Sequence, residues 1–133
     1  MPTSAAEALS TIPLFRNLSS RQLRKLQRSA AEDHYEPDAT IVPQGGRTTT
    51  LFVVLEGSVK VVKNGKTISH LGPGQYFGEI SLIDGRPRAA SVISETPVRC
   101  LALSQDSLQK LLMTEPSVSW ALLESLAQRL RGE

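Results

Sequence analysis

The sequence contains a single cysteine, two histidines and only 5% aromatic residues, and it has no long apolar run. One cysteine, Cys100, cannot form an internal disulfide, so a disulfide-stabilised scaffold is excluded and the cytoplasm is the expected location. Cys100 lies in a strand-like run and is expected to be a packed thiol. The longest apolar run, Leu51–Leu55, is far too short to cross a bilayer, and Met1–Thr11 lacks the basic start and apolar stretch of a secretory signal. No membrane association is therefore expected.

Motifs for metal binding and catalysis are also missing. His34 and His70 are isolated and far apart in sequence, whereas a histidine metal site usually needs a close pair and further ligands. The sequence has no Gly-x-Ser-x-Gly segment, no cysteine–histidine pairing and no phosphate loop with a lysine. We therefore expect no metal, no cofactor and no catalytic residue, and a chain that is not an enzyme.

The 133 residues, 40% hydrophobic and 21% charged, are enough for one domain with a buried core. The net charge of +2 is too small to indicate nucleic acid by itself. Four cations do cluster near the N-terminus, but the apolar residues among them predict the solvated face of an amphipathic helix. The cations are Arg21, Arg24, Lys25 and Arg28, and the apolar residues are Leu18, Leu23, Leu26 and Ala30.

The pattern of the chain predicts three parts within one domain, residues 1–133. These are an N-terminal helical segment at 1–32, a β region at 33–104 and C-terminal helices at 105–133. The expected helices are Ser4–Leu9, Ser19–Ala31, Asp106–Met113 and Pro116–Arg131. Ser19 and Gln22 fit a capping box at the start of the second, and Gly132 is a plausible stop for the last.

Short β segments separated by turn residues fill the middle of the chain. They are His34–Glu36, Thr40–Val42, Leu51–Leu55, Ser58–Val62, Thr67–Leu71, Ala90–Ile93 and Val98–Leu103. Asn64-Gly65 is the best hairpin turn because this dipeptide favours the type I′ geometry. The spacing predicts a mainly β fold with flanking helices (α+β), an antiparallel β-roll or jelly roll with N-terminal helices, a short inserted helix and two C-terminal helices.

The inserted segment, Phe77–Val92, reads FGEISLIDGRPRAASV and concentrates the special residues of the chain. Gly78 permits a positive φ and a close approach of a ligand to the backbone. Glu79–Ile83 is long enough for one helical turn, which Asp84-Gly85 then stops. Pro87 stiffens the backbone so that Arg88 can return towards the same place.

This arrangement predicts an anion pocket with an acidic residue beside it. The first N–H groups of the turn and the planar guanidinium of Arg88 both suit a phosphate. Glu79 would repel a phosphate unless the ligand also carries a hydroxyl, as a ribose with a 3′,5′-cyclic phosphate does at its 2′ position. Arg88 would neutralise Glu79 without ligand. A purely structural Arg88–Glu79 ion pair is the alternative, but it would not need the surrounding Gly78, Gly85 and Pro87.

The segment closely resembles the phosphate-binding cassette of the cyclic nucleotide-binding domain family, whose members bind cAMP or cGMP in a β-roll closed by a C-terminal helix. The resemblance spans about Leu14 to Leu130. It implies a binding set in the cassette, Gly78, Glu79, Ile80, Ser81, Arg88, Ala89 and Ala90. cGMP-selective relatives often carry Thr or Ser at the position of Ala89, so cAMP is the expected ligand and cGMP the second possibility.

Other positions follow the family or depart from it. Glu56-Gly57 resembles the glycine-centred turn of relatives, whereas Gln44-Gly45-Gly46-Arg47 stands where relatives tend to have a Glu-Gly-Asp run. That departure concerns the conformation of one loop, not the pocket. Arg86 is expected to face solvent. Arg129 and Arg131 lie where some relatives contact the purine.

The last helix carries two apolar stripes where one would be enough to cover the roll. The first stripe is Val118, Leu122 and Leu126, and the second is Trp120, Leu123, Ala127 and Leu130. The second stripe could be a lid over the purine, a surface for a partner helix, or more of the core. Trp120 is expected in the core rather than as a stacking platform.

The resemblance implies a non-enzymatic receptor or regulatory module that relays cyclic nucleotide binding through its C-terminal helix to an effector domain or a second subunit. Two alternatives stay open. The chain could be the sensor half of a larger regulator, since relatives resembling catabolite activators continue into a DNA-binding helix-turn-helix that this sequence does not contain. It could also be a degenerate module that binds partner proteins and no nucleotide.

Overall fold

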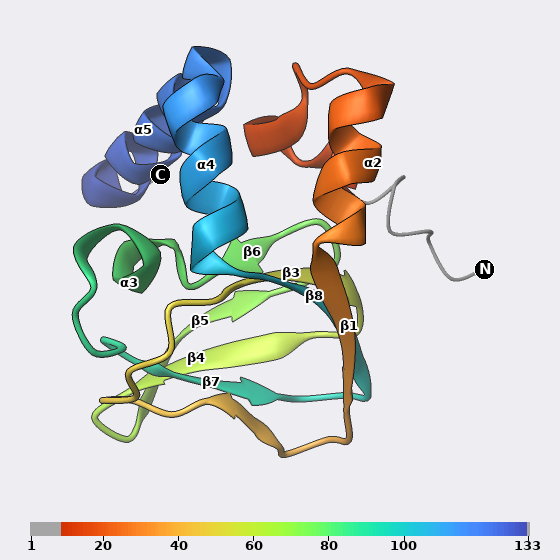
Figure 1. The fold of residues 1–133 in the computed structure, drawn as a ribbon. Helices are drawn as coiled ribbons and strands as arrows, with labels where there is room; N and C mark the ends of the chain where they lie inside the picture. The colour runs from red at the N-terminus through yellow and green to blue at the C-terminus, as the bar shows by residue number, and fades with distance from the viewer. Residues whose placement is uncertain (1–8, 133) are drawn as a thin grey trace.

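The computed structural model describes residues 9–132, without the side chains of Glu79, Ile80 and Leu82. Within that range the strands form two four-stranded antiparallel sheets, with orders β1-β8-β3-β6 and β2-β7-β4-β5. Figure 1 shows the helices gathered at one end of this roll, on the side of the first sheet. The predicted antiparallel roll with flanking helices is confirmed.

The strands are β1 Ala30–Tyr35, β2 Thr40–Val42, β3 Leu51–Glu56, β4 Val59–Lys63, β5 Lys66–Leu71, β6 Tyr76–Phe77, β7 Ser91–Ser94 and β8 Val98–Leu103. The helices are the 3₁₀ turn η1 Pro13–Phe15, α2 Ser20–Arg28, α3 Glu79–Asp84, α4 Gln105–Thr114 and α5 Pro116–Arg131. The expected helix Ser4–Leu9 lies outside the described residues except for Leu9. No helix between residues 9 and 132 has the length and apolar content to span a membrane.

Helix α2 begins as predicted and ends earlier than predicted. The Ser19 backbone N–H donates to Gln22 Oε1 at 2.8 Å and the Gln22 N–H donates to Ser19 Oγ at 3.1 Å, which is the expected capping box. The four clustered cations are exposed. The helix ends at Arg28 and not at Ala31, because Ala30 and Ala31 pair with Leu103 and Ala102 of β8. Strand β1 therefore starts four residues before the predicted His34, since distant strand pairing overrides local helix propensity.

Turn chemistry in the roll agrees with the sequence. Asn64 and Gly65 both have positive φ, 53° and 78°, as the predicted type I′ turn requires.

The sequence did not predict the two-residue strand β6, because a pair of aromatic residues between Gly74 and Gly78 carries no period-two pattern. It exists because Tyr76 and Phe77 pair with Val53 and Phe52 of β3.

Strand β3 is buried on both faces and joins two apolar cores. Leu51, Val53 and Leu55 belong to the cluster under the helices, whereas Phe52 and Val54 belong to the cluster between the sheets. The alternation follows the two-residue period of a strand. This explains why β3 is the longest apolar run of the sequence.

Cys100 lies in the inter-sheet core with no exposed surface, as expected. Burial, with smaller contributions from the charges of Asp33 and Glu32, raises the pKa of its thiol to about 12. The thiol is therefore neutral at physiological pH and serves as a small packed apolar group.

The two stripes of α5 have different environments. Val118 and Leu122 are buried against the helical core and Leu126 is half-buried, whereas Trp120 is 66% exposed and Leu123 and Leu130 are exposed as well. The expectation that Trp120 belongs to the core is wrong. Residues two positions apart on a helix point in nearly opposite directions, so burial of Val118 and Leu122 turns Trp120 towards solvent.

Gly57→Ala should destabilise the fold strongly. Gly57 has φ of 89° in the turn after β3, and a Cβ there would overlap the Pro97 carbonyl oxygen and approach Thr96 Oγ1. We expect a loss of about 2–4 kcal/mol in the free energy of unfolding, measured by urea denaturation. Gly72→Ala is the control, because Gly72 lacks a positive φ and nothing lies within 4 Å of its Cβ position. Equal losses in both variants would contradict the steric argument.

Candidate ligand-binding site

A cavity of about 490 Å³ lies between the sheet β2-β7-β4-β5, the cassette and α5. Its volume is within the range of small-molecule sites. Five of the seven predicted binding residues line it, namely Gly78, Ser81, Arg88, Ala89 and Ala90. The other two are Glu79 and Ile80, whose side chains lie outside the description. The remaining lining residues are Val42, Val61, Lys63, Ile68, Ser69, Leu71, Gln75, Phe77, Val92 and Arg129.

Glycines bound the cassette helix at both ends, as the sequence predicted. Gly78 precedes α3 with φ of 100°, and Gly85 follows it with φ of 69°. A Cβ on Gly78 would come within 2.5 Å of Arg88 Nη1 and 2.6 Å of the Thr50 carbonyl oxygen. Glycine at this position therefore serves two purposes, the left-handed backbone and the close approach of Arg88.

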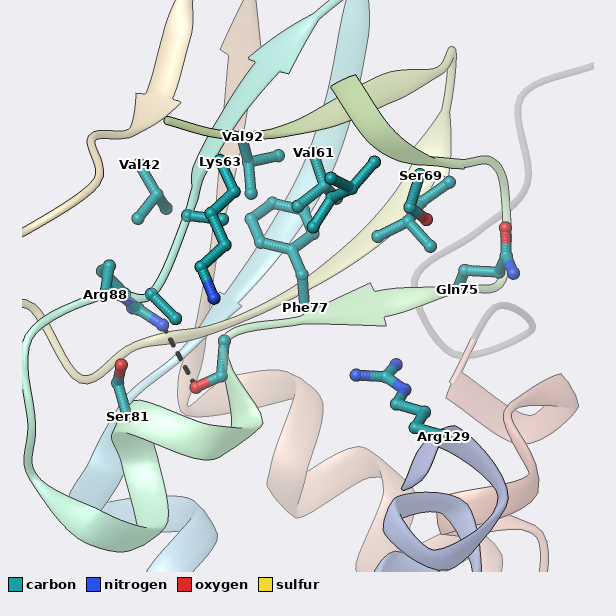
Figure 2. A pocket seen from close by; sticks show the side chains of 15 residues that line it. Val42, Val61, Lys63, Ser69, Gln75, Phe77, Ser81, Arg88, Val92 and Arg129 are labelled. Carbon is teal, nitrogen blue, oxygen red and sulfur yellow. Dashed lines mark hydrogen bonds between the residues drawn. The ribbon is translucent and has the colours of Figure 1, made fainter. Parts of the chain in front are cut away.

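Arg88 is fixed by both its side chain and its backbone. Its Nη1 donates to the Gly78 carbonyl at 3.1 Å, drawn in Figure 2, and its Nη2 donates to the Thr50 carbonyl at 2.6 Å and to Thr48 Oγ1 at 3.3 Å. Its N–H donates to the Gly46 carbonyl at 2.7 Å, and its own carbonyl accepts from the Gly45 N–H at 2.8 Å.

Sequence reasoning missed these partners of Arg88. Gly45-Gly46 was interpreted as a turn and as a departure from the family, and Thr48 and Thr50 carried no local signal at all. The structure shows that the departing loop is the backbone partner of the cassette. Its two glycines were the one available hint, since glycine often marks a close approach of two backbones.

The guanidinium of Arg88 is a buried cation whose described partners are all neutral. Only 5% of the residue is exposed, and burial lowers its pKa. An arginine nevertheless stays charged at physiological pH. Its buried Nε has no hydrogen-bond partner among the described side chains and backbone groups. The expected Arg88–Glu79 ion pair involves a carboxylate outside the description and remains a prediction.

Polar groups gather at the two ends of the cavity and apolar groups lie between them. In Figure 2, Arg88, Ser81 and the ammonium of Lys63 are at one end, and Arg129 and Gln75 are at the other. Phe77, Val61 and the other apolar residues form the surface between the ends, and Phe77 stacks on Phe52 with 5.1 Å between ring centroids. An anionic group suits the first end and a flat ring suits the apolar surface.

Of the two arginines of α5 that the family resemblance singled out, one lines the cavity and the other does not. Arg129 lines the cavity from α5, donates to the Tyr76 carbonyl at 3.3 Å and lies 5.2 Å from the centroid of the Tyr76 ring. Arg131 is exposed and does not line the cavity. Arg86 is exposed, as expected.

The two histidines lie in different sheets. His34 Nε2 lies 3.7 Å from Glu32 Oε2, and His70 Nδ1 lies 2.9 Å from Glu95 Oε1. Residues 9–132 contain no group of three or more His, Cys, Asp or Glu side chains that could hold a metal ion, as far as their side chains are described.

The roll, the glycine-bounded helix and the buried arginine define a class of ligand-binding domain, and a family model agrees with it. The model described as "Cyclic nucleotide-binding domain" matches residues 32–115. The chain therefore belongs to the cyclic nucleotide-binding domain family. The match contains the whole cassette and ends at the start of α5.

Individual relatives support the same conclusion. The chain is 26% identical over 130 residues to the CRP-like cAMP-activated global transcriptional regulator of Mycobacterium tuberculosis, with 94% of this chain and 58% of the relative covered. It is 35% identical to the N-terminal domain of a transcriptional regulator from Streptomyces coelicolor (TM-score 0.75; 94% and 90% covered). It is 31% identical to the Thermus thermophilus catabolite activator protein (TM-score 0.80; 90% and 59% covered). The chain thus spans little more than half of the M. tuberculosis regulator.

Gly78→Ala should disrupt the site beyond the cost of backbone strain. The added Cβ would displace Arg88 Nη1 or the start of β3, so we expect a loss of about 3 kcal/mol or more in the free energy of unfolding. Gly85 also has a positive φ, but nothing lies within 4 Å of its Cβ position. Gly85→Ala should therefore lower the free energy of unfolding by only about 1 kcal/mol. Urea denaturation of both variants measures the difference. Similar losses would mean that the Gly78–Arg88 contact is not constraining.

Proposed function

We propose that this chain is a non-enzymatic cyclic nucleotide receptor module with cAMP as its preferred ligand. The observation that carries the proposal is the buried guanidinium of Arg88, which faces a cavity of about 490 Å³ and has only neutral described partners. A buried charge without a counter-ion is costly, and an anion bound beside it removes much of that cost. A cyclic phosphate supplies one negative charge and oxygen acceptors for the remaining N–H groups.

The rest of the cavity supports a nucleoside attached to that phosphate. Ser81 is a buried hydroxyl at the cation end and can donate to a phosphate oxygen. Glu79 follows Gly78 directly, and its carboxylate is the expected acceptor for the ribose 2′-hydroxyl. The apolar surface around Val61 and Phe77 suits a purine, and Ala89 has no hydroxyl for a guanine amino group. These features favour cAMP over cGMP.

Helix α5 is the element through which ligand binding would be transmitted to an effector. Arg129 on α5 donates to the carbonyl of Tyr76, and the Tyr76 hydroxyl donates to Ser125 Oγ at 2.6 Å. Tyr76 lies two residues before Gly78, so the short strand β6 connects α5 to the cassette. A ligand that favours one arrangement of this connection over another shifts the position of α5. These contacts support the proposal that α5 relays ligand binding to an effector.

The exposed stripe of α5 fits a second copy of the chain. Its residues follow the three–four spacing of a coiled-coil seam, and the same helix on another copy carries the matching stripe. They are Trp120, Leu123, Ala127 and Leu130.

The M. tuberculosis relative favours one alternative, a sensor region of a larger transcriptional regulator, because this chain matches only 58% of it. The degenerate module is disfavoured by the intact Arg88 environment. A cytoplasmic location is part of the proposal.

Arg88→Leu tests the ligand role. We expect cAMP binding, measured by calorimetry, to weaken by about 2–5 kcal/mol, because one side of a buried charge pair is removed. Arg86→Leu is the matched control, since Arg86 is exposed two residues away and should leave the affinity unchanged. Arg88→Lys keeps the charge without the planar fork and should be intermediate. Unchanged cAMP affinity in a folded Arg88→Leu variant refutes the assigned role, and a parallel cGMP titration tests the preference.

Leu123→Glu tests the stripe. Sedimentation velocity should give a dimer for the wild-type chain and a monomer for the variant, because a charge would be buried at the centre of the seam. Met113→Glu is the control, since Met113 is an exposed apolar residue on α4 outside the stripe. A wild-type monomer, with and without cAMP, would exclude the second copy as the partner.

A further inference from the structure

Lys63 is a cation of the cavity that lies outside the cassette and outside the predicted binding set. It is the last residue of β4, and both Val61 and Lys63 line the cavity whereas Lys60 and Val62 do not. The alternation places the Lys63 side chain on the inner face of the strand. Figure 2 shows the side chain running into the cavity with its ammonium towards the end occupied by Arg88 and Ser81.

A chain of hydrogen bonds joins the position of Lys63 to that of Arg88. The next residue, Asn64, donates its N–H to Gln44 Oε1 at 2.9 Å and accepts from Gln44 Nε2 at 2.8 Å through its Oδ1. The two residues after Gln44 are Gly45 and Gly46, which make the backbone bonds to Arg88. One short loop therefore holds the β4–β5 hairpin tip against the cassette, so Lys63 and Arg88 share a scaffold.

The charge around Lys63 favours an anion. Lys63 pairs directly across the hairpin with Lys66, and like charges in that arrangement repel. Among the lining side chains that the structure describes, Lys63, Arg88 and Arg129 are cations and none is a carboxylate. No ion pair of Lys63 is found with any described side chain.

We propose that Lys63 is a second cation for the phosphate of the ligand, a binding residue that β4 adds to the cassette. The inference rests on the proposed function and deepens it. Arg88 is buried and prearranged, whereas Lys63 is exposed and its ammonium is a mobile point charge. Solvent ions screen exposed charges far more than buried ones, so Lys63 supplies the salt-sensitive part of the affinity and Arg88 the part that salt changes little.

The test is a calorimetric titration with cAMP at low and high salt. Lys63→Met keeps the apolar stem and removes the charge, so we expect about fivefold to tenfold weaker binding at low salt and a smaller difference at high salt. Lys63→Arg should stay within about twofold of wild type because it keeps the charge. Lys66→Met is the matched control, since Lys66 lies opposite Lys63 but does not line the cavity, and it should bind like wild type.

Thermal unfolding without ligand separates a binding role from a structural one. Lys63→Met should be at least as stable as wild type, since it removes a like-charge pair, yet cAMP should raise its unfolding temperature less. Wild-type affinity of Lys63→Met at both salt concentrations overturns the proposal while leaving Arg88 as the anion site. A loss of affinity that salt does not change, with lower stability, also overturns it. If the wild-type chain binds neither cAMP nor cGMP, the proposed function and the proposed role of Lys63 both fail.

Discussion

The burial of one guanidinium constrains the whole site. Arg88 can lie 95% buried because the carbonyls of Gly78 and Thr50 and the hydroxyl of Thr48 accept hydrogen bonds from its guanidinium. These acceptors come from two separate stretches of chain, Gly78 at the start of the cassette and the loop that directly precedes β3. Each must be in place for the charge to be tolerated. The proposed phosphate site is therefore a product of the tertiary fold and not of the cassette alone.

The packing of the surrounding roll holds these acceptors in place. Thr50 directly precedes β3, the strand that is buried on both faces, so its carbonyl is held by the two apolar cores. The stacked Phe52 and Phe77 then connect β3 to the strand that leads into Gly78. Apolar packing thus sets the distance between Gly78 and Thr50. Since interiors are close-packed, that distance is not freely adjustable, which prearranges the site before any ligand arrives.

Local chemistry was readable from the sequence and distant pairing was not. The Ser19–Gln22 capping box, the Asn64-Gly65 turn and the glycines around α3 each depend on a few neighbouring residues, and the structure has all of them. The start of β1 at Ala30 and the exposure of Trp120 depend on partners far along the chain, and both were predicted wrongly. Thr48, Thr50 and Lys63 were missed for the same reason. The residues of the cassette and the family resemblance both pointed to Arg88, but neither indicated what holds it.

The two cations proposed to bind the phosphate differ in what they would contribute. Arg88 is fixed by neutral acceptors, so it would lose little rotamer freedom when a phosphate binds, and its fixed geometry would select the ligand. Lys63 is exposed and repelled by Lys66, so its charge acts over a longer range and raises the local concentration of anions. Because Arg129 of α5 contacts Tyr76 beside the cassette, the proposed relay runs through the prearranged part of the site. Changes at Lys63 should therefore alter how tightly the ligand binds without altering the arrangement of α5 that the bound ligand favours.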